Sequence, residues 1–360
     1  MMPLLLRPQN DEILSSWLIR NSIANGSDPM GFVSGIWFDR RPWTIDYDRT
    51  APDEMISTLA RTTGVSVDRL RKMTLRPTVT YLIGNPNPEP KTAWPWVIPI
   101  GSRNRMRMNG LHFCPECLTE KNAYFKKAWR LSWNTACPKH RILLALHCPR
   151  CHQVFSPHLV DYRSPYIHIC TRCGFDLRKA PSSNADPVAV ELQDAMSDAL
   201  KSRTFDSDRI GTELGEDSVV ELFRFVRDLT TFFRNLRRRP KMYEVMTEDL
   251  GFEPDGLVFE RAMGTSIDSA SAEERHLFFR ISALTLRKRR QEVVEFFSEH
   301  GVTRNALDDL CRSDSATMRS IRMKLEERSR KRTTRKCVHS IGPRSKEEVE
   351  AAMEKIRRYL

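Results

Sequence analysis

The sequence predicts a mainly α-helical protein with a small β component, in which a metal-binding middle region separates two helical regions. Three observations lead to this prediction. Seven of the nine cysteines lie close together, between Cys114 and Cys173. Apolar residues recur every three to four positions on either side of that segment, as in amphipathic helices. Two breaks rich in proline and small residues, at 85–99 and 180–187, interrupt any helix and divide the chain into three parts.

The breaks and the cysteine spacing together predict the domain organisation. We expect an N-terminal helical module over 1–84, a proline-rich connector over 85–110, tandem zinc ribbons over 111–180 and a basic C-terminal helical domain over 188–360.

Composition limits the classes of protein to be considered. The 360 residues are 40% hydrophobic and 29% charged, as in globular proteins. No apolar run approaches the roughly 20 residues that cross a bilayer, and the start MMPLLLRPQND is shorter than a secretion signal. We therefore expect no membrane association and a cytoplasmic protein associated with the nucleoid. The net charge of +12 favours a polyanionic partner, double-stranded DNA first, over a merely basic protein.

The N-terminal module begins with an expected amphipathic helix. The segment RPQNDEILSSWLIRNSIANG offers a cap at Asn10 or Asp11 and ends at Asn25 and Gly26.

Residues 56–75 then resemble a helix-turn-helix, with Ala60 at the helix crossing and Gly64 in the turn. If the second helix enters a major groove, its outward side chains contact DNA. A helical hairpin that never meets DNA fits the pattern equally well. The candidate DNA contacts here are Ser66, Arg69, Arg71 and Lys72.

The cysteine-rich middle contains four knuckles in which two ligands are separated by two residues: CPECL at 114–118, ACPKH at 136–140, CPRC at 148–151 and CTRC at 170–173. Such a gap aims two side chains at one tetrahedral ion. Four protein ligands leave no open position for water, so two structural Zn²⁺ ions are expected, and an iron–sulfur cluster is the rival. The first ligand set is Cys114, Cys117, Cys137 and His140, and the second is Cys148, Cys151, Cys170 and Cys173.

Two further features of the middle region have alternative interpretations. His147 and His152 adjoin ligating cysteines, and we expect them outside the completed tetrahedra. The segment TEKNAYFKKAWRLSWNT mixes aromatics with cations, which suits either the stacking of bases or the small core of a ribbon. The core interpretation is favoured.

The C-terminal half is expected to be helical and carries three basic runs, at 235–241, 286–291 and 328–336. A single run of this kind is commonly a solvated helix face, but three in one half favour contact with phosphates. The candidate DNA contacts are Arg237, Arg238, Arg239, Arg287, Lys288, Arg289, Arg290, Arg330, Lys331 and Arg332.

Taken together, the motifs resemble the TniQ family of transposon target-selection proteins. The resemblance covers about residues 5–175 and rests on HFCPECL, YFKKAWRLSW, ACPKH, HCPRC and the pattern PxxDExxSSWLxR. In this chain the last pattern is Pro8, Asp11, Glu12, Ser15, Ser16, Trp17, Leu18 and Arg20.

The resemblance implies a non-catalytic adaptor for DNA transposition. Such a protein recognises a target, either a DNA site or an RNA-guided complex, and recruits an AAA+ ATPase that regulates the transposase. The resemblance places Trp17 and Arg20 in the family signature. The oligomeric state is left open between a monomer and a homodimer.

Two other functions compete with this interpretation. One is a zinc-containing transcription regulator that binds an operator and recruits no transposition partner. The other is a nuclease with its site in the C-terminal half, although no strand and helix units that would gather catalytic carboxylates are apparent.

Overall fold

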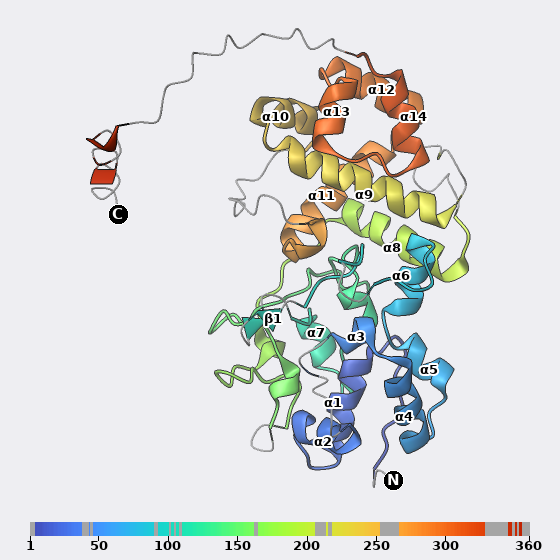
Figure 1. Cartoon of the computed structure of the whole chain (residues 1–360), viewed down its shortest axis with the longest axis vertical. Helices are drawn as coiled ribbons and strands as arrows, with labels where there is room; N and C mark the ends of the chain where they lie inside the picture. Colours follow the sequence, from blue (N-terminus) through green and yellow to red (C-terminus); the bar gives the residue numbers. More distant parts are fainter. Residues whose placement is uncertain are drawn as a thin grey trace. The chain divides into compact units, whose positions relative to one another are not determined.

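The structure is a computed structural model, and it describes residues 4–37, 43, 46–89, 93–100, 102–103, 106–107, 110–161, 165–205, 214, 218–252, 266–327, 345–347, 350 and 353–354. Residues 1–326 form one compact unit and residues 327–360 a second (Figure 1). In the second unit the described residues after Glu327 are exposed to solvent.

The N-terminal helices are short, and local sequence sets some of their ends. Helix α1 begins after Ile13, without a side-chain cap, and not after the expected Asn10 or Asp11. Asp28 accepts a hydrogen bond from the amide of Gly31 and caps α2, which starts with Pro29. Gly64 ends α4 at a φ of 71°, where a left-handed backbone suits glycine. The helices are α1 (Leu14–Ala24), α2 (Pro29–Ile36), α3 (Tyr47–Thr50), α4 (Asp53–Thr63), α5 (Val67–Lys72) and α6 (Arg76–Ile83).

The middle region contains little regular structure. Strands β1 (Ser102–Arg103) and β2 (Met106–Arg107) form one antiparallel pair, and isolated bridges such as Phe113 to Ala145 connect the ribbon loops. The short helices here are α7 (Pro115–Leu118), η2 (Lys127–Arg130), η3 (Pro157–Leu159) and η4 (Leu177–Lys179).

The C-terminal helices pack around α9, the long central helix of this part of the chain (Figure 1). The described residues are therefore mainly helical with almost no strands, which confirms the predicted fold class. Among them, no helix has the length and apolar character that a bilayer crossing requires. The elements are α8 (Pro187–Ser202), α9 (Val219–Leu236), α10 (Pro240–Asp249), η6 (Ile267–Ser269), α11 (Ala272–Leu286), α12 (Arg290–Glu299), α13 (Arg304–Leu310) and α14 (Ala316–Lys324).

One hydrophobic core joins the ribbons to the C-terminal helices, and a smaller one lies among α1, α2, α4 and α5. Within the larger core, the Trp96 ring meets Trp133, Phe223 and Phe279 edge to face, at centroid distances of 5.9, 5.6 and 6.2 Å. Aromatic pairs of this geometry stabilise beyond their buried area. The connector, the first ribbon, α9 and α11 thus share one apolar centre.

Buried polar side chains of α8 and α11 hold the backbone of the first ribbon. The Gln193 side-chain oxygen accepts from the amides of Thr135 and Ala136 at 2.8 and 3.0 Å. His276 Nε2 accepts from the amide of Asp186 at 2.8 Å, and its Nδ1 lies 2.8 Å from Thr135 Oγ1. His276 is therefore neutral, and burial lowers its pKa to about 4.

A buried ion pair joins the N-terminal helices to the first ribbon. Arg130 has no exposed side-chain surface, and its guanidinium lies 2.6 Å from Asp46 and 3.4 Å from Asp48. It also donates to the carbonyl of Ile98 at 3.1 Å. Because Asp48 accepts from the amide of Ser15 at 2.8 Å, the pair also fixes the start of α1.

We predict that Arg130→Met lowers the free energy of unfolding by about 3–5 kcal/mol, because it leaves Asp48 buried without its cation and leaves Asp46 with only the more distant Arg49, at 3.9 Å. Arg178→Met is the matched control, since Arg178 pairs with Asp176 at 2.8 Å while 41% of its side chain is exposed. The control should cost less than about 1 kcal/mol. Urea unfolding followed by far-UV circular dichroism measures both, and equal losses would contradict the role given to Arg130.

A second prediction concerns acid and His276. The folded pKa of about 4 lies below the usual 6.5, so the unfolded chain binds the extra proton across that window. The contribution is fully present above about pH 6.5 and is lost as pH falls toward 4. We expect His276→Gln, which keeps a donor and an acceptor but does not titrate, to lose about 2 kcal/mol less than the wild type between pH 7 and pH 5. Parallel stability curves would contradict this.

Candidate zinc centres

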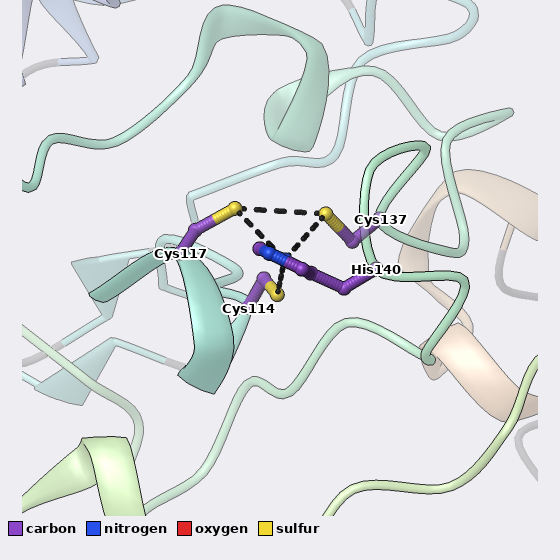
Figure 2. Close-up of side chains that lie close together, drawn as sticks. All are labelled: Cys114, Cys117, Cys137 and His140. Carbon is purple, nitrogen blue, oxygen red and sulfur yellow. Dashed lines mark hydrogen bonds between the residues drawn. The ribbon is translucent and has the colours of Figure 1, made fainter. Parts of the chain in front are cut away.

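The first cluster consists of Cys114, Cys117, Cys137 and His140, whose ligand atoms all lie within 4.8 Å of one another (Figure 2). His140 Nδ1 faces the three sulfurs of Cys114, Cys117 and Cys137 at 3.3, 3.4 and 3.6 Å. The sulfurs of Cys117 and Cys137 are 3.6 Å apart. The three cysteines are buried, so the cluster belongs to the core.

These separations fit a tetrahedral zinc ion. Sulfur at about 2.3 Å and nitrogen at about 2.0 Å from the metal place two sulfurs about 3.8 Å apart and a sulfur about 3.5 Å from the nitrogen. The second cluster, Cys148, Cys151, Cys170 and Cys173, agrees as well: Cys148 lies 3.6 Å from Cys173 and Cys151 lies 3.7 Å from Cys170. The two clusters are consistent with two structural zinc ions.

Three of the four knuckles share one backbone conformation. The residue after the second ligand, Arg141, His152 or Gly174, has a φ of 55°, 55° or 71°. Its amide donates to the carbonyl of the first ligand at 2.8, 2.9 or 2.9 Å. This turn points both ligand side chains to the same side. The remaining knuckle differs, because Cys114 precedes α7 and Cys117 lies within it.

The pKa values of the crowded thiols also favour a bound cation at these sites. Hydrogen bonds with Cys117 and Cys137 raise the pKa of Cys114, while hydrogen bonds from Cys114 and Cys117 lower the pKa of Cys137. Burial raises the pKa of Cys170 to about 12. Thiols crowded in this way share protons rather than ionise together. A divalent cation takes the place of those protons and allows all the ligands to bind as thiolates.

Nearby side chains complete the surroundings of the clusters. Lys126 Nζ lies 3.7 Å from Cys117 Sγ, where its charge offsets the negative charge that three thiolates leave on a bound Zn²⁺. His147 and His152 are exposed and belong to neither cluster. The aromatic residues Phe125, Trp129 and Trp133 are buried, so they form core rather than an exposed stacking surface.

The signature residues Trp17 and Arg20 help to attach α1 to the first ribbon and to the N-terminal arm, the described residues 4–13 that precede α1. Arg20 contacts both oxygens of Glu12, at 2.7 and 2.9 Å, and Glu12 accepts from Ser16 Oγ at 3.0 Å. Ser16 Oγ in turn accepts from the amide of Phe125 at 2.9 Å. The buried Trp17 indole donates to the carbonyl of Leu6 at 2.8 Å. This part of the signature therefore performs a structural task.

The candidate DNA contacts of the hairpin have intramolecular partners. Ser66 caps α5 by accepting from the amide of Arg69 at 3.2 Å. The Arg69 guanidinium donates to the carbonyl of Gln9 at 3.0 Å. Arg71 lies 3.0 Å from Asp53, and Lys72 lies 2.7 Å from Asp68.

The basic runs of the C-terminal half are also partly neutralised. Arg237 lies 3.6 Å from Glu274, Arg239 lies 3.5 Å from Asp309 and Arg287 lies 2.8 Å from Glu191. Lys288 lies over the ring of Phe296 at 5.2 Å. Arg289 and Arg290 lie at the start of α12, and Arg238 is exposed on the surface beside α9. Arg330, Lys331 and Arg332 lie outside the described residues.

The start of α14 shows contacts that the sequence did not predict. Two carboxylates of α9 cap this helix: Asp228 accepts from the amide and hydroxyl of Ser315, and Glu221 accepts from the amide and hydroxyl of Thr317 at 2.7 Å each. Because partners 96 residues apart in the sequence make such a bond, no local pattern reveals it. The first turn of α14 is thereby committed to α9.

In a comparison with protein families, a model of the TniQ family matches residues 3–144. The match includes α1 to α7 and the whole first zinc cluster. It confirms the family resemblance seen in the motifs. A search of curated proteins returns no match.

We predict that Cys137→Ser and Cys173→Ser each reduce the zinc content from two ions per chain to one, but with unequal effects on stability. Cys137 is buried in the large core, whereas Cys173 is partly exposed and lies in the second ribbon. Cys137→Ser should therefore lower the melting temperature more. Elemental analysis and thermal unfolding measure the two quantities. Cys311→Ser, outside both clusters, should keep two ions, and loss of zinc from it would contradict the assignment.

Proposed function

Because the chain carries a TniQ region over residues 3–144, we propose that it is a non-catalytic adaptor that selects target sites for DNA transposition. In this role it contacts double-stranded target DNA, or a targeting complex already bound there, and recruits an AAA+ ATPase that regulates the transposase. The observation that carries the proposal is the family match across a region that includes the first zinc cluster. The match supports a transposition-associated role in target selection.

The chemistry of the clusters supports an adaptor rather than a metalloenzyme. Catalytic zinc keeps a coordination position for water or substrate, and here four protein side chains fill each tetrahedron. The ions would thus fix loop geometry, and the work of the protein would be done by the surfaces that those loops support.

The positive charge supports contact with DNA. Phosphates are bound most readily by cations that no carboxylate already neutralises. Within the described residues, Arg238 and Arg290 have no carboxylate partner, in contrast to Arg237, Arg239 and Arg287. We propose Arg238 and Arg290 as the phosphate contacts of the C-terminal half.

The transcription regulator considered from the sequence is not favoured, because the family match concerns transposition. A regulator would protect a two-fold symmetric operator with half-sites about one helical turn apart.

The decisive experiment maps insertions made by the cognate transposase and AAA+ ATPase with and without this chain. We expect insertions to gather at discrete targets only when the zinc-loaded chain is present. Cys148→Ser should abolish this targeting while the transposase still acts on supplied ends, and Cys311→Ser should preserve it. An identical distribution of insertions with and without the chain would contradict the proposal.

A second arm identifies what chooses the target. Sheared genomic DNA is captured by the purified chain at near-physiological salt and then sequenced. One enriched site assigns the choice to this chain, and sequence-blind, salt-sensitive binding assigns it to a partner complex.

A further inference from the structure

A notch between α4 and α6 is lined by two arginines, Arg71 and Arg76. It is a hollow of about 290 Å³ whose lining includes Asp53, Ile56, Arg71, Arg76 and Thr80. Arg71 comes from the end of α5 and Arg76 from the start of α6, so two guanidinium groups line one small space. Asp53 is the acidic residue among the lining side chains.

The helix that would read bases is poorly suited to do so. Helix α5 has six residues, or roughly 9 Å of length. Its Arg69 is held by the carbonyl of Gln9, and the carbonyl of Lys72 accepts from Lys127 Nζ at 2.9 Å. The N-terminal arm and the first ribbon therefore contact the helix that would have to enter a major groove. Reading a base requires a side chain that is free to reach its edge.

The two arginines of the notch retain donors. Arg71 contacts Asp53 through Nη2 at 3.0 Å, and this pair is weak because 52% and 66% of the two side chains are exposed. Arg76 donates to the neutral Asn87 side chain at 3.0 Å. A guanidinium carries five N–H donors, and within the described residues Arg71 and Arg76 each donate one hydrogen bond to a side chain, so the other donors are left for a ligand. A phosphate group matches this geometry and charge, because guanidinium groups bind its oxygens in pairs.

We propose that the hairpin of α4 and α5, together with the start of α6, binds a phosphate of the nucleic-acid backbone in the notch, through Arg71 and Arg76. In this proposal α5 does not read bases. The inference rests on the proposed function, since it supposes that the chain contacts DNA. Arg76 gives up its hydrogen bond to Asn87 and binds the phosphate instead. Arg71 gives up its exposed contact with Asp53 and binds the same phosphate. The hairpin then contributes affinity and orientation, while sequence preference comes from elsewhere.

The test measures binding of the full chain to two duplexes of unrelated sequence over a range of salt concentrations. The variants are Arg71→Gln, Arg76→Gln and the double variant; Arg178→Gln is the charge-matched control outside the notch, and Arg69→Gln tests base reading. Losing one phosphate contact should reduce the magnitude of the slope of log K against log salt by about 0.9. For each tenfold rise in salt, the Kd of the variant should therefore increase about eightfold less than that of the wild type. The two duplexes should lose affinity by the same factor, and Arg69→Gln should not alter their ratio.

Several outcomes would overturn the inference. If Arg69→Gln changes the ratio between the duplexes, α5 reads bases. If the double variant keeps the wild-type slope while its zinc content and melting temperature are unchanged, the notch holds no phosphate, and the proposed function stands without it. If inorganic phosphate binds the wild type but not Arg76→Gln, while the double variant keeps the wild-type slope for DNA, the notch takes the free anion and not the nucleic-acid backbone. If the wild type binds neither duplex, DNA contact itself fails and the notch proposal fails with it.

Discussion

The rest of the structure depends on how zinc fixes the segment between Cys117 and Cys137. This segment contains little regular secondary structure, so part of its backbone pairs with groups from other segments, as the amide of Ser132 does with the carbonyl of Trp96. Other elements supply the partners: Ser16 binds the amide of Phe125, Gln193 binds the amide of Thr135, and Arg275 binds the carbonyl of Ser132 at 2.5 Å. A buried polar side chain tolerates little displacement of such a partner, because an unmade hydrogen bond costs more than a made one returns. Held at both ends by ligands to one ion, the segment becomes a rigid template onto which α1, α8 and α11 dock.

Buried ion pairs also fix the position of the first ribbon against the helices. Asp268 in η6 accepts from the amide of Trp96 and from Ser132 Oγ, and it pairs with Arg227 of α9 at 2.7 Å. With Arg130 and its two aspartates, this gives the first ribbon a charged contact on both sides. Such contacts contribute little net stability compared with apolar packing, but a mismatched partner leaves a charge unpaired. They therefore specify how the helices sit on the ribbon more than they increase its stability.

The sequence predicted what is local and failed where partners are distant. The zinc ligands follow from two-residue gaps within single turns, and the end of α4 follows from Gly64, because each depends on residues a few positions apart. The fold class followed from helical periodicity for the same reason. In contrast, Arg130 stood in an aromatic and basic stretch for which a ribbon core was favoured over base stacking, and nothing local identified its partners, which lie 82 and 84 residues away. Gln193 and His276 have no nearby sequence pattern that would predict their hydrogen bonds to the first ribbon.

Charge runs illustrate the limit most clearly. A run of arginines counts as positive in a sequence, but folding sets the acids of other segments opposite some of its members and not others. In the run at 235–241, Arg237 and Arg239 meet Glu274 and Asp309, and within the described residues Arg238 between them meets no carboxylate. Near this run, the field that an approaching polyanion experiences therefore depends on which arginines remain unpaired and not only on how many arginines the run contains. For the adaptor proposed above, this distribution would matter more than its sum, because a few separated phosphate contacts fix orientation on a duplex, whereas a uniform basic face would bind in any register.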